Sequence, residues 1–177
     1  MNYENMFERL KDLYDNYRTA MMNRKYYGYK LARIKKYNLL FELTIALGTT
    51  SSGIAAWTVW QYGAGKIVWG IITAVAIVLA FLKPFLKLSN TVERYSTLFI
   101  GHGDVAYDLK TIVSKVKIYQ NFNKELDNAY IASIERFKQL AARDDPKLDK
   151  ELVRKCYDEV NKEIPPNQLW IPQKGGG

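Results

Sequence analysis

The chain contains few of the residues from which catalytic and metal sites are usually built. Its 177 residues include one histidine, His102, and one cysteine, Cys156. A structural zinc site takes four ligands, mostly from these two residue types, and a single cysteine leaves no partner for an internal disulfide. YGAGK, at residues 62–66, resembles a phosphate-binding Walker fragment only superficially. We therefore expect no enzyme, no metal site and no cofactor.

Charge is missing from one long stretch of the chain. Between Leu43 and Leu82 the only charged residue is Lys66. The flanking segments, in contrast, are rich in lysine, arginine, glutamate and tyrosine. The mean hydropathy of −0.25 therefore averages two different kinds of sequence.

Each half of the uncharged stretch is long enough to cross a bilayer, which takes about 20 mainly apolar residues. We predict transmembrane helices at 38–62 and 67–86, joined by an external turn at 63–66. Two buried helices of a soluble protein are the alternative, but neither helix would then have a polar face. That alternative also leaves unexplained the aromatic residues near the turn, which are typical of a membrane interface: Trp57, Trp60, Tyr62 and Trp69.

The first predicted span contains an unusual polar run, GTTSSG, at residues 48–53. Backbone groups in lipid must be satisfied within the helix, and serine and threonine hydroxyls can bond to carbonyls of the preceding turn. Three pairs of small residues are spaced four apart, as in closely packed membrane helices: Gly48/Ser52, Thr49/Gly53 and Ser52/Ala56. We expect this face to pack against another helix or, less commonly, to line a pore: Gly48, Thr49, Ser52 and Gly53.

Basic residues predict the orientation of the spans. Six cations and no acid lie between Arg24 and Lys36, and Lys83, Lys87 and Arg94 follow the second span. The positive-inside rule therefore places both termini in the cytoplasm, at a bacterial inner (plasma) membrane. These cations would also favour anionic lipid, which is a sufficient reason for much of the net charge of +8. Nucleic acid is not expected as a partner, because no basic face with interleaved stacking residues is evident.

Heptad patterns flank the spans. Apolar residues recur at alternating intervals of three and four from Tyr3 to Ile34 and again from Leu88 to Tyr119. Further helical patterns follow, the last beginning near Asp145 and Pro146. The expected fold is an all-α membrane protein, in which a two-span helical hairpin continues into a cytoplasmic antiparallel coiled coil and helical bundle. The predicted order is a cytoplasmic helix at 1–37, the spans, a bundle at 87–164 and a tail at 165–177 whose terminal glycines are typical of an added sequence.

Two pairs of polar residues are candidate sites. Glu42 and Lys83 fall at similar depths at the cytoplasmic ends of the two spans, where they can form an interfacial ion pair or separately reach water. Arg24 and His102 interrupt the two heptad seams at equal distances from the membrane. We expect them to share a polar layer of the stalk, which either fixes the helix register or forms a hinge or ligand site.

The order of these segments is similar to that of a known family. A tyrosine- and lysine-rich helix, YDNYRTAMMNRKYYGYKLARIKKYN, precedes two spans with a minimal turn, and KLSNTVERYSTLFIGHGDVAYDLKTIV follows them. This arrangement resembles the SLATT domains, two-span effectors of prokaryotic conflict systems. The resemblance implies a pore-forming or membrane-disrupting effector, switched on by a separately encoded nucleotide-signal synthase, reverse transcriptase or other sensor.

The expected function is therefore that of an oligomeric membrane effector in anti-phage defence and abortive infection. Two spans cannot enclose a channel, so a pore requires a homo-oligomer. The alternative is a non-conducting membrane anchor whose cytoplasmic coiled coil recruits a partner protein.

Overall fold

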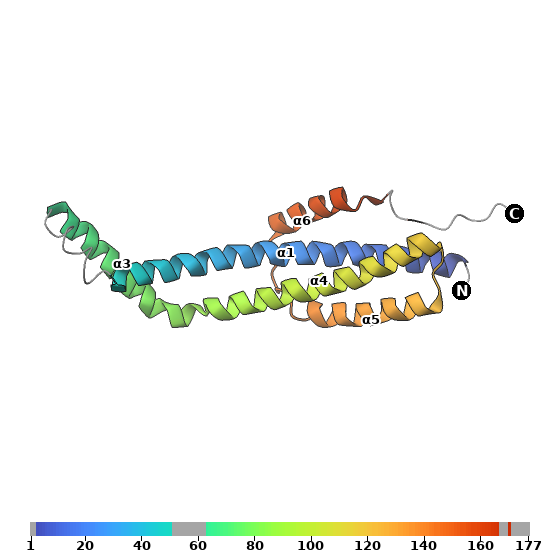
Figure 1. The fold of residues 1–177 in the computed structure, drawn as a ribbon, viewed down its shortest axis with the longest axis horizontal. Helices are drawn as coiled ribbons and strands as arrows, with labels where there is room; N and C mark the ends of the chain where they lie inside the picture. Colours follow the sequence, from blue (N-terminus) through green and yellow to red (C-terminus); the bar gives the residue numbers. More distant parts are fainter. Residues whose placement is uncertain (1–2, 51–62, 167–169, 171–177) are drawn as a thin grey trace. The chain divides into compact units, whose positions relative to one another are not determined.

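The computed structural model describes residues 3–50, 63–166 and 170 of the chain. Regular structure in this part of the chain is helical, without a strand, as predicted for an all-α protein. Five helices are present (Figure 1): α1 (Tyr3–Thr50), α3 (Gly63–Leu86), α4 (Leu88–Tyr119), α5 (Lys124–Ala141) and α6 (Lys150–Glu163).

The chain divides into two compact units. Residues 1–29 and 95–177 form one, called here the bundle unit, and residues 30–94 form the other, called the apolar unit. The long helices α1 and α4 each contribute to both units, because the division falls within them. The predicted boundary at residue 37 does not coincide with a helix end, since α1 continues to Thr50.

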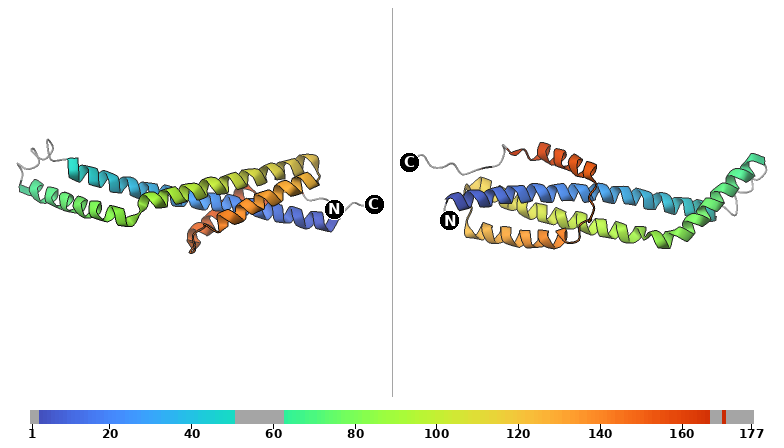
Figure 2. Two further views of the ribbon diagram at one scale, coloured as in Figure 1. Left: turned by 90° about the horizontal axis from the view of Figure 1, so that it is seen from below. Right: turned by 180° about the vertical axis from the view of Figure 1, so that it is seen from behind.

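Most positions of the predicted heptad seams form the core of the bundle unit, but Tyr119, the last predicted seam position of α4, is 70% exposed. α1 and α4 run antiparallel there, and α5 lies alongside α4 (Figure 2). Residues at intervals of three and four face this core because those intervals place them on one side of a helix. The buried seam positions are Leu10, Leu13, Tyr17, Ala20 and Tyr27 of α1, and Leu98, His102, Val105, Leu109, Ile112 and Val116 of α4.

Side-chain caps define where the two shorter helices begin. The Asn123 side chain accepts a hydrogen bond from the Leu126 N–H at the start of α5, at 2.9 Å. Asp149 does the same for α6, accepting from the Leu152 N–H at 3.2 Å. Both are residue types that favour this position because their short side chains reach an unpaired backbone N–H. The expectation that α6 starts near Asp145 is therefore wrong by about one turn, and Leu148 lies outside the helix, 49% exposed.

In the apolar unit, the junction between α3 and α4 has an uncommon backbone conformation. Pro84 lies in the last turn of α3, where it cannot donate a backbone hydrogen bond. Lys87 then adopts a φ of 45°, in the left-handed region that non-glycine residues seldom occupy. Both the N–H and the hydroxyl of Thr91 donate hydrogen bonds to the Lys87 carbonyl, at 3.1 and 3.2 Å. These two bonds stabilise the first turn of α4.

Helix α6 packs on the bundle unit through a narrow apolar face and a polar margin. Its buried residues are Leu152, Cys156 and Val160. At the margin, Lys25 of α1 lies 2.7 Å from Glu163 and 3.3 Å from Glu159. A hydrogen bond from Tyr29 and the nearby Lys25 lower the pKa of Glu159. Few apolar residues therefore hold α6, and Cys156 lies on the inner face of this helix with none of its surface exposed.

We expect Cys156 to react slowly with a thiol reagent until α6 separates from the bundle. Burial raises the pKa of this thiol, so its reactive thiolate should form at higher pH in the folded chain than in the unfolded chain. Because the folded pKa is raised, the stabilisation is complete below the unfolded thiol's pKa and is lost as the pH rises. The measurement is the maleimide labelling rate as a function of pH, with and without urea.

The matched control moves the thiol by one residue. Cys156→Ala combined with Tyr157→Cys places it at a position that is 54% exposed in the native chain. This variant should label rapidly without urea. Equal rates at the two positions would show that Cys156 is not buried between α6 and the rest of the bundle.

Candidate functional site

Helix α3 presents an apolar surface that the described chain leaves largely uncovered. The stretch Ile67–Leu86 is long and apolar enough to cross a membrane, and 6% of it is buried. It is the one such helix among the described residues. Isoleucine, valine and phenylalanine side chains are exposed around the helix; Ile77, for example, is 64% exposed and Phe81 is 70% exposed. A soluble protein would seldom expose a contiguous surface of this kind.

The predicted first span is described only in part. α1 includes residues 38–50, whereas residues 51–62 lie outside the described chain. The polar face of Gly48, Thr49, Ser52 and Gly53 therefore lies outside the side chains that can be described. The predicted turn at 63–66 is wrong in detail, because α3 begins at Gly63 and these residues form its first turn.

Glu42 and Lys83 are brought together in the apolar unit. The Lys83 ammonium nitrogen lies 3.7 Å from a Glu42 carboxylate oxygen, which also accepts a hydrogen bond from Asn38 at 3.2 Å. About half of each charged side chain is exposed, 47% for Lys83 and 49% for Glu42. In water such a pair contributes about 0–1 kcal/mol. The pair joins α1 to the end of α3 at the border between the apolar helix and the basic residues.

An apolar groove in the same unit is lined by residues of α1, α3 and the start of α4. It has a volume of about 350 Å³, and its lining includes Tyr37 and Phe41 of α1 and Leu79 of α3. Lys35 and Lys36 are exposed on the same part of α1. The apolar unit thus combines an uncovered apolar helix, an apolar groove and a border of positive charge.

Arg24 lies against Gly103, the neighbour of His102, where a Cβ would be 3.4 Å from the Arg24 Nε, but the Arg24 and His102 side chains have different partners. His102 is fully buried; its Nε2 lies 2.9 Å from Asp144 and its ring stacks on Tyr27 with centroids 5.4 Å apart. Arg24 is exposed, and its guanidinium lies 5.6 Å from the centre of the Phe99 ring. Arginine can keep its charge in water at a seam position because its long side chain reaches the surface. The histidine bonds instead to the loop between α5 and α6 through Nε2, whereas its buried Nδ1 has no hydrogen-bond partner among the described residues.

Three tyrosines hold this loop from the side of α1 and α4. The Tyr27 hydroxyl accepts a hydrogen bond from the Asp145 N–H at 2.9 Å, and the Tyr26 hydroxyl accepts one from the Asp149 N–H at 3.1 Å. Tyr95 donates to the Asp145 carboxylate at 3.2 Å. Burial raises the pKa of Tyr27, so this hydroxyl stays protonated over the physiological range.

The sequence reasoning missed this tyrosine cluster. The available signals were the tyrosine-rich run YYGY in α1 and the pair of acids before Pro146. Gly101 adds to the same region, because a Cβ there would lie 2.6 Å from Leu140 of α5. Glycine therefore lets α5 approach α4 closely beside the buried histidine.

Comparison of the chain with protein-family models, with curated proteins and with solved structures gives no match.

The Glu42–Lys83 pair leads to a charge-swap prediction. Glu42→Lys or Lys83→Glu alone places like charges together, so each should lower the stability of the chain in detergent by about 1 kcal/mol or less. Combining the two should restore most of the loss, because opposite charges face each other again. The measurement is the free energy of unfolding in a mild detergent.

Lys36→Glu provides the control, since Lys36 is exposed in the same unit. It should show no coupling to Glu42→Lys. A double swap equal to the sum of its single changes would mean that the two residues reach water independently.

Proposed function

We propose that this chain is an oligomeric membrane effector that forms a pore or disrupts the bilayer when triggered. The observation that carries the proposal is the exposed apolar surface of α3, which requires lipid or other apolar helices to cover it. The apolar segment ending at residue 62 serves as the first span and α3 as the second, so that the two form a hairpin with both termini in the cytoplasm. Basic residues on α1 and after α3 favour this orientation at a bacterial inner membrane.

The bundle unit serves in this proposal as the cytoplasmic part that receives the trigger. Helix α1 belongs without a break to both units, which supports a mechanical role. The resemblance of the sequence to the SLATT domains supports the further expectation of anti-phage defence and of a separately encoded sensor. Oligomerisation follows from geometry, because two spans cannot surround a conducting path.

Insertion of α3 can be tested through the position of the C-terminus. Replacing Ile77 and Phe81 by lysine places two charges near the middle of the helix, at a cost of about 2.5–3.5 kcal/mol each. The second span should then fail to insert, and the C-terminus should move out of the cytoplasm. Fluorescent-protein and alkaline-phosphatase fusions to the C-terminus report the two locations.

The matched control replaces Ile118 and Tyr119 by lysine. These residues are 73% and 70% exposed at the far end of α4, so the topology should not change. If the α3 variant keeps its C-terminus in the cytoplasm, α3 is not a membrane span of this hairpin.

Conduction can be separated from anchoring by measuring membrane potential in cells that express the chain with its genomic neighbours. We expect depolarisation, and we expect Gly53→Leu to abolish it while the protein stays in the membrane fraction. The larger side chain blocks the close approach of helices, but it makes the segment more apolar and so does not impair insertion.

Gly70→Leu is the matched glycine control on α3, where an added Cβ meets no atom within 4 Å. It should retain depolarisation. An unchanged potential in cells expressing the unaltered chain, with or without its neighbours, would favour the non-conducting anchor.

A further inference from the structure

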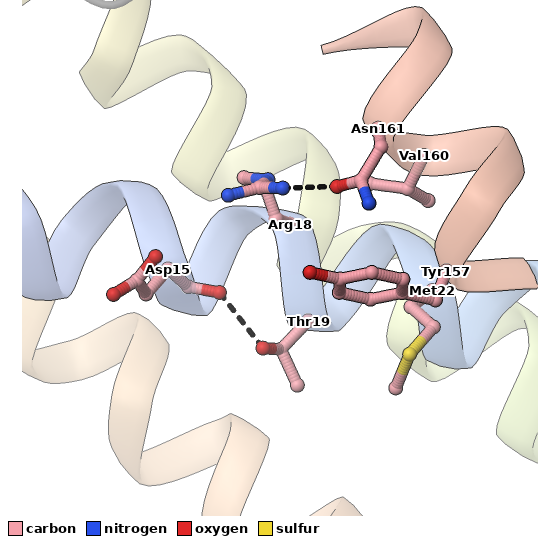
Figure 3. A pocket seen from close by; sticks show the side chains of 7 residues that line it. All are labelled: Asp15, Arg18, Thr19, Met22, Tyr157, Val160 and Asn161. Carbon is pink, nitrogen blue, oxygen red and sulfur yellow. Dashed lines mark hydrogen bonds between the residues drawn. The ribbon is translucent and has the colours of Figure 1, made fainter. Parts of the chain in front are cut away.

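A cavity of about 200 Å³ lies between α1 and α6 in the bundle unit. Figure 3 shows its lining, with Arg18 on α1 opposite Tyr157 and Asn161 on α6. Met22 and Val160 supply an apolar part of the wall, and Asp15 and Thr19 of α1 complete it, so the cavity combines one cation, one acid and an apolar surface.

The Arg18 guanidinium lacks a partner that matches its charge. One terminal N–H group donates to the neutral side-chain oxygen of Asn161, and the buried Nε has no acceptor among the described residues. A guanidinium remains charged at every physiological pH, and its planar donors fit the paired oxygens of a carboxylate or phosphate. Leaving a buried donor unpaired is unfavourable. An oxyanion beside this side chain would supply the missing hydrogen-bond acceptor and a negative charge.

The acid nearest in sequence does not fill this role. Asp15 is exposed, and Figure 3 shows its carboxylate directed away from Arg18. Its backbone carbonyl accepts the hydroxyl hydrogen bond of Thr19, at 2.8 Å. The charged end of Arg18 therefore faces the cavity without a carboxylate from α1.

The opposite wall suits a flat apolar group. The Tyr157 side chain is 54% exposed, and in Figure 3 its ring spans the cavity with its hydroxyl toward Arg18 and Thr19. Met22 lies on the other side of the ring. In another protein a cavity of about 150 Å³ holds one benzene molecule, so this cavity has room for one small ring.

We infer that the cavity binds a small molecule that carries a carboxylate or phosphate group on a flat apolar body. The oxyanion accepts hydrogen bonds from Arg18, and the apolar body lies against Tyr157 and Met22. Such a ligand contacts both α1 and α6, and its binding holds α6 in place. The lining residues belong to the bundle unit, so this inference does not rest on the proposed membrane activity.

Four probes separate the chemical contributions in the purified full-length chain. Phenyl phosphate and benzoate carry a ring with either oxyanion, inorganic phosphate carries the charge alone, and benzyl alcohol carries the ring alone. Calorimetry measures binding, and the labelling rate of Cys156 reports whether α6 stays docked. At ten times its dissociation constant, a ligand of the native state should slow labelling about tenfold.

We expect saturable binding of phenyl phosphate or benzoate, with weaker binding of inorganic phosphate and none of benzyl alcohol. The stronger of the two ring compounds identifies the oxyanion. Arg18→Gln should remove the binding, and Arg18→Lys, which keeps the charge without the planar donors, should weaken it. Arg136→Gln should leave it unchanged, because Arg136 is exposed and pairs with Asp108 elsewhere on the bundle.

Two results would overturn the inference. The first is the absence of saturable binding by either ring compound in the unaltered chain, which would mean that Arg18 serves only to hold α6 through Asn161. The second is equal binding by the unaltered chain and Arg18→Gln, which would indicate a general salt effect. Calorimetry on Arg18→Lys keeps the test decisive if Arg18→Gln fails to fold.

Discussion

The heptad pairing of α1 with α4 is the contact on which the bundle unit depends. Antiparallel helices with apolar residues at intervals of three and four bury a stripe that divides into two clusters, a larger one around Leu13 and Leu109 and a smaller one around Tyr27 and Leu98. This core provides the surface on which α5 packs. Helix α6 adds Cys156 to the smaller cluster and is secured at its margin by the ion pairs of Lys25.

The sequence was sufficient to predict the helices and most of the core, because periodicity reports directly which residues share a helix face. The prediction of side-chain partners failed for Arg24 and His102. Arg24 occupies a seam position, yet its charge remains at the surface, and His102 finds its partner in a loop far along the chain. Heptad spacing carries no information about such contacts. The start of α6 was misplaced for a related reason, since Asp145 and Asp149 are equally suitable helix caps in sequence.

The candidate sites were predictable to different degrees. Glu42 and Lys83 could be paired from counting alone, because depth in a bilayer follows residue number along a helix. The Arg18 cavity could not be predicted, since it depends on how α6 is seated against α1. A hydrogen bond to an amide 143 positions away has no signature in either helix taken alone.

The hydroxyls of Tyr26 and Tyr27 accept hydrogen bonds from backbone N–H groups of the segment before α6. These bonds to the main chain would by themselves tolerate most side chains at positions 145 and 149, proline excepted. Both positions also use their carboxylates, however, because Asp145 accepts a hydrogen bond from Tyr95 and Asp149 caps α6. Losing either tyrosine hydroxyl would leave a backbone donor of the loop unpaired. In distant relatives, we therefore expect the tyrosines of α1 and these two acids to be kept together.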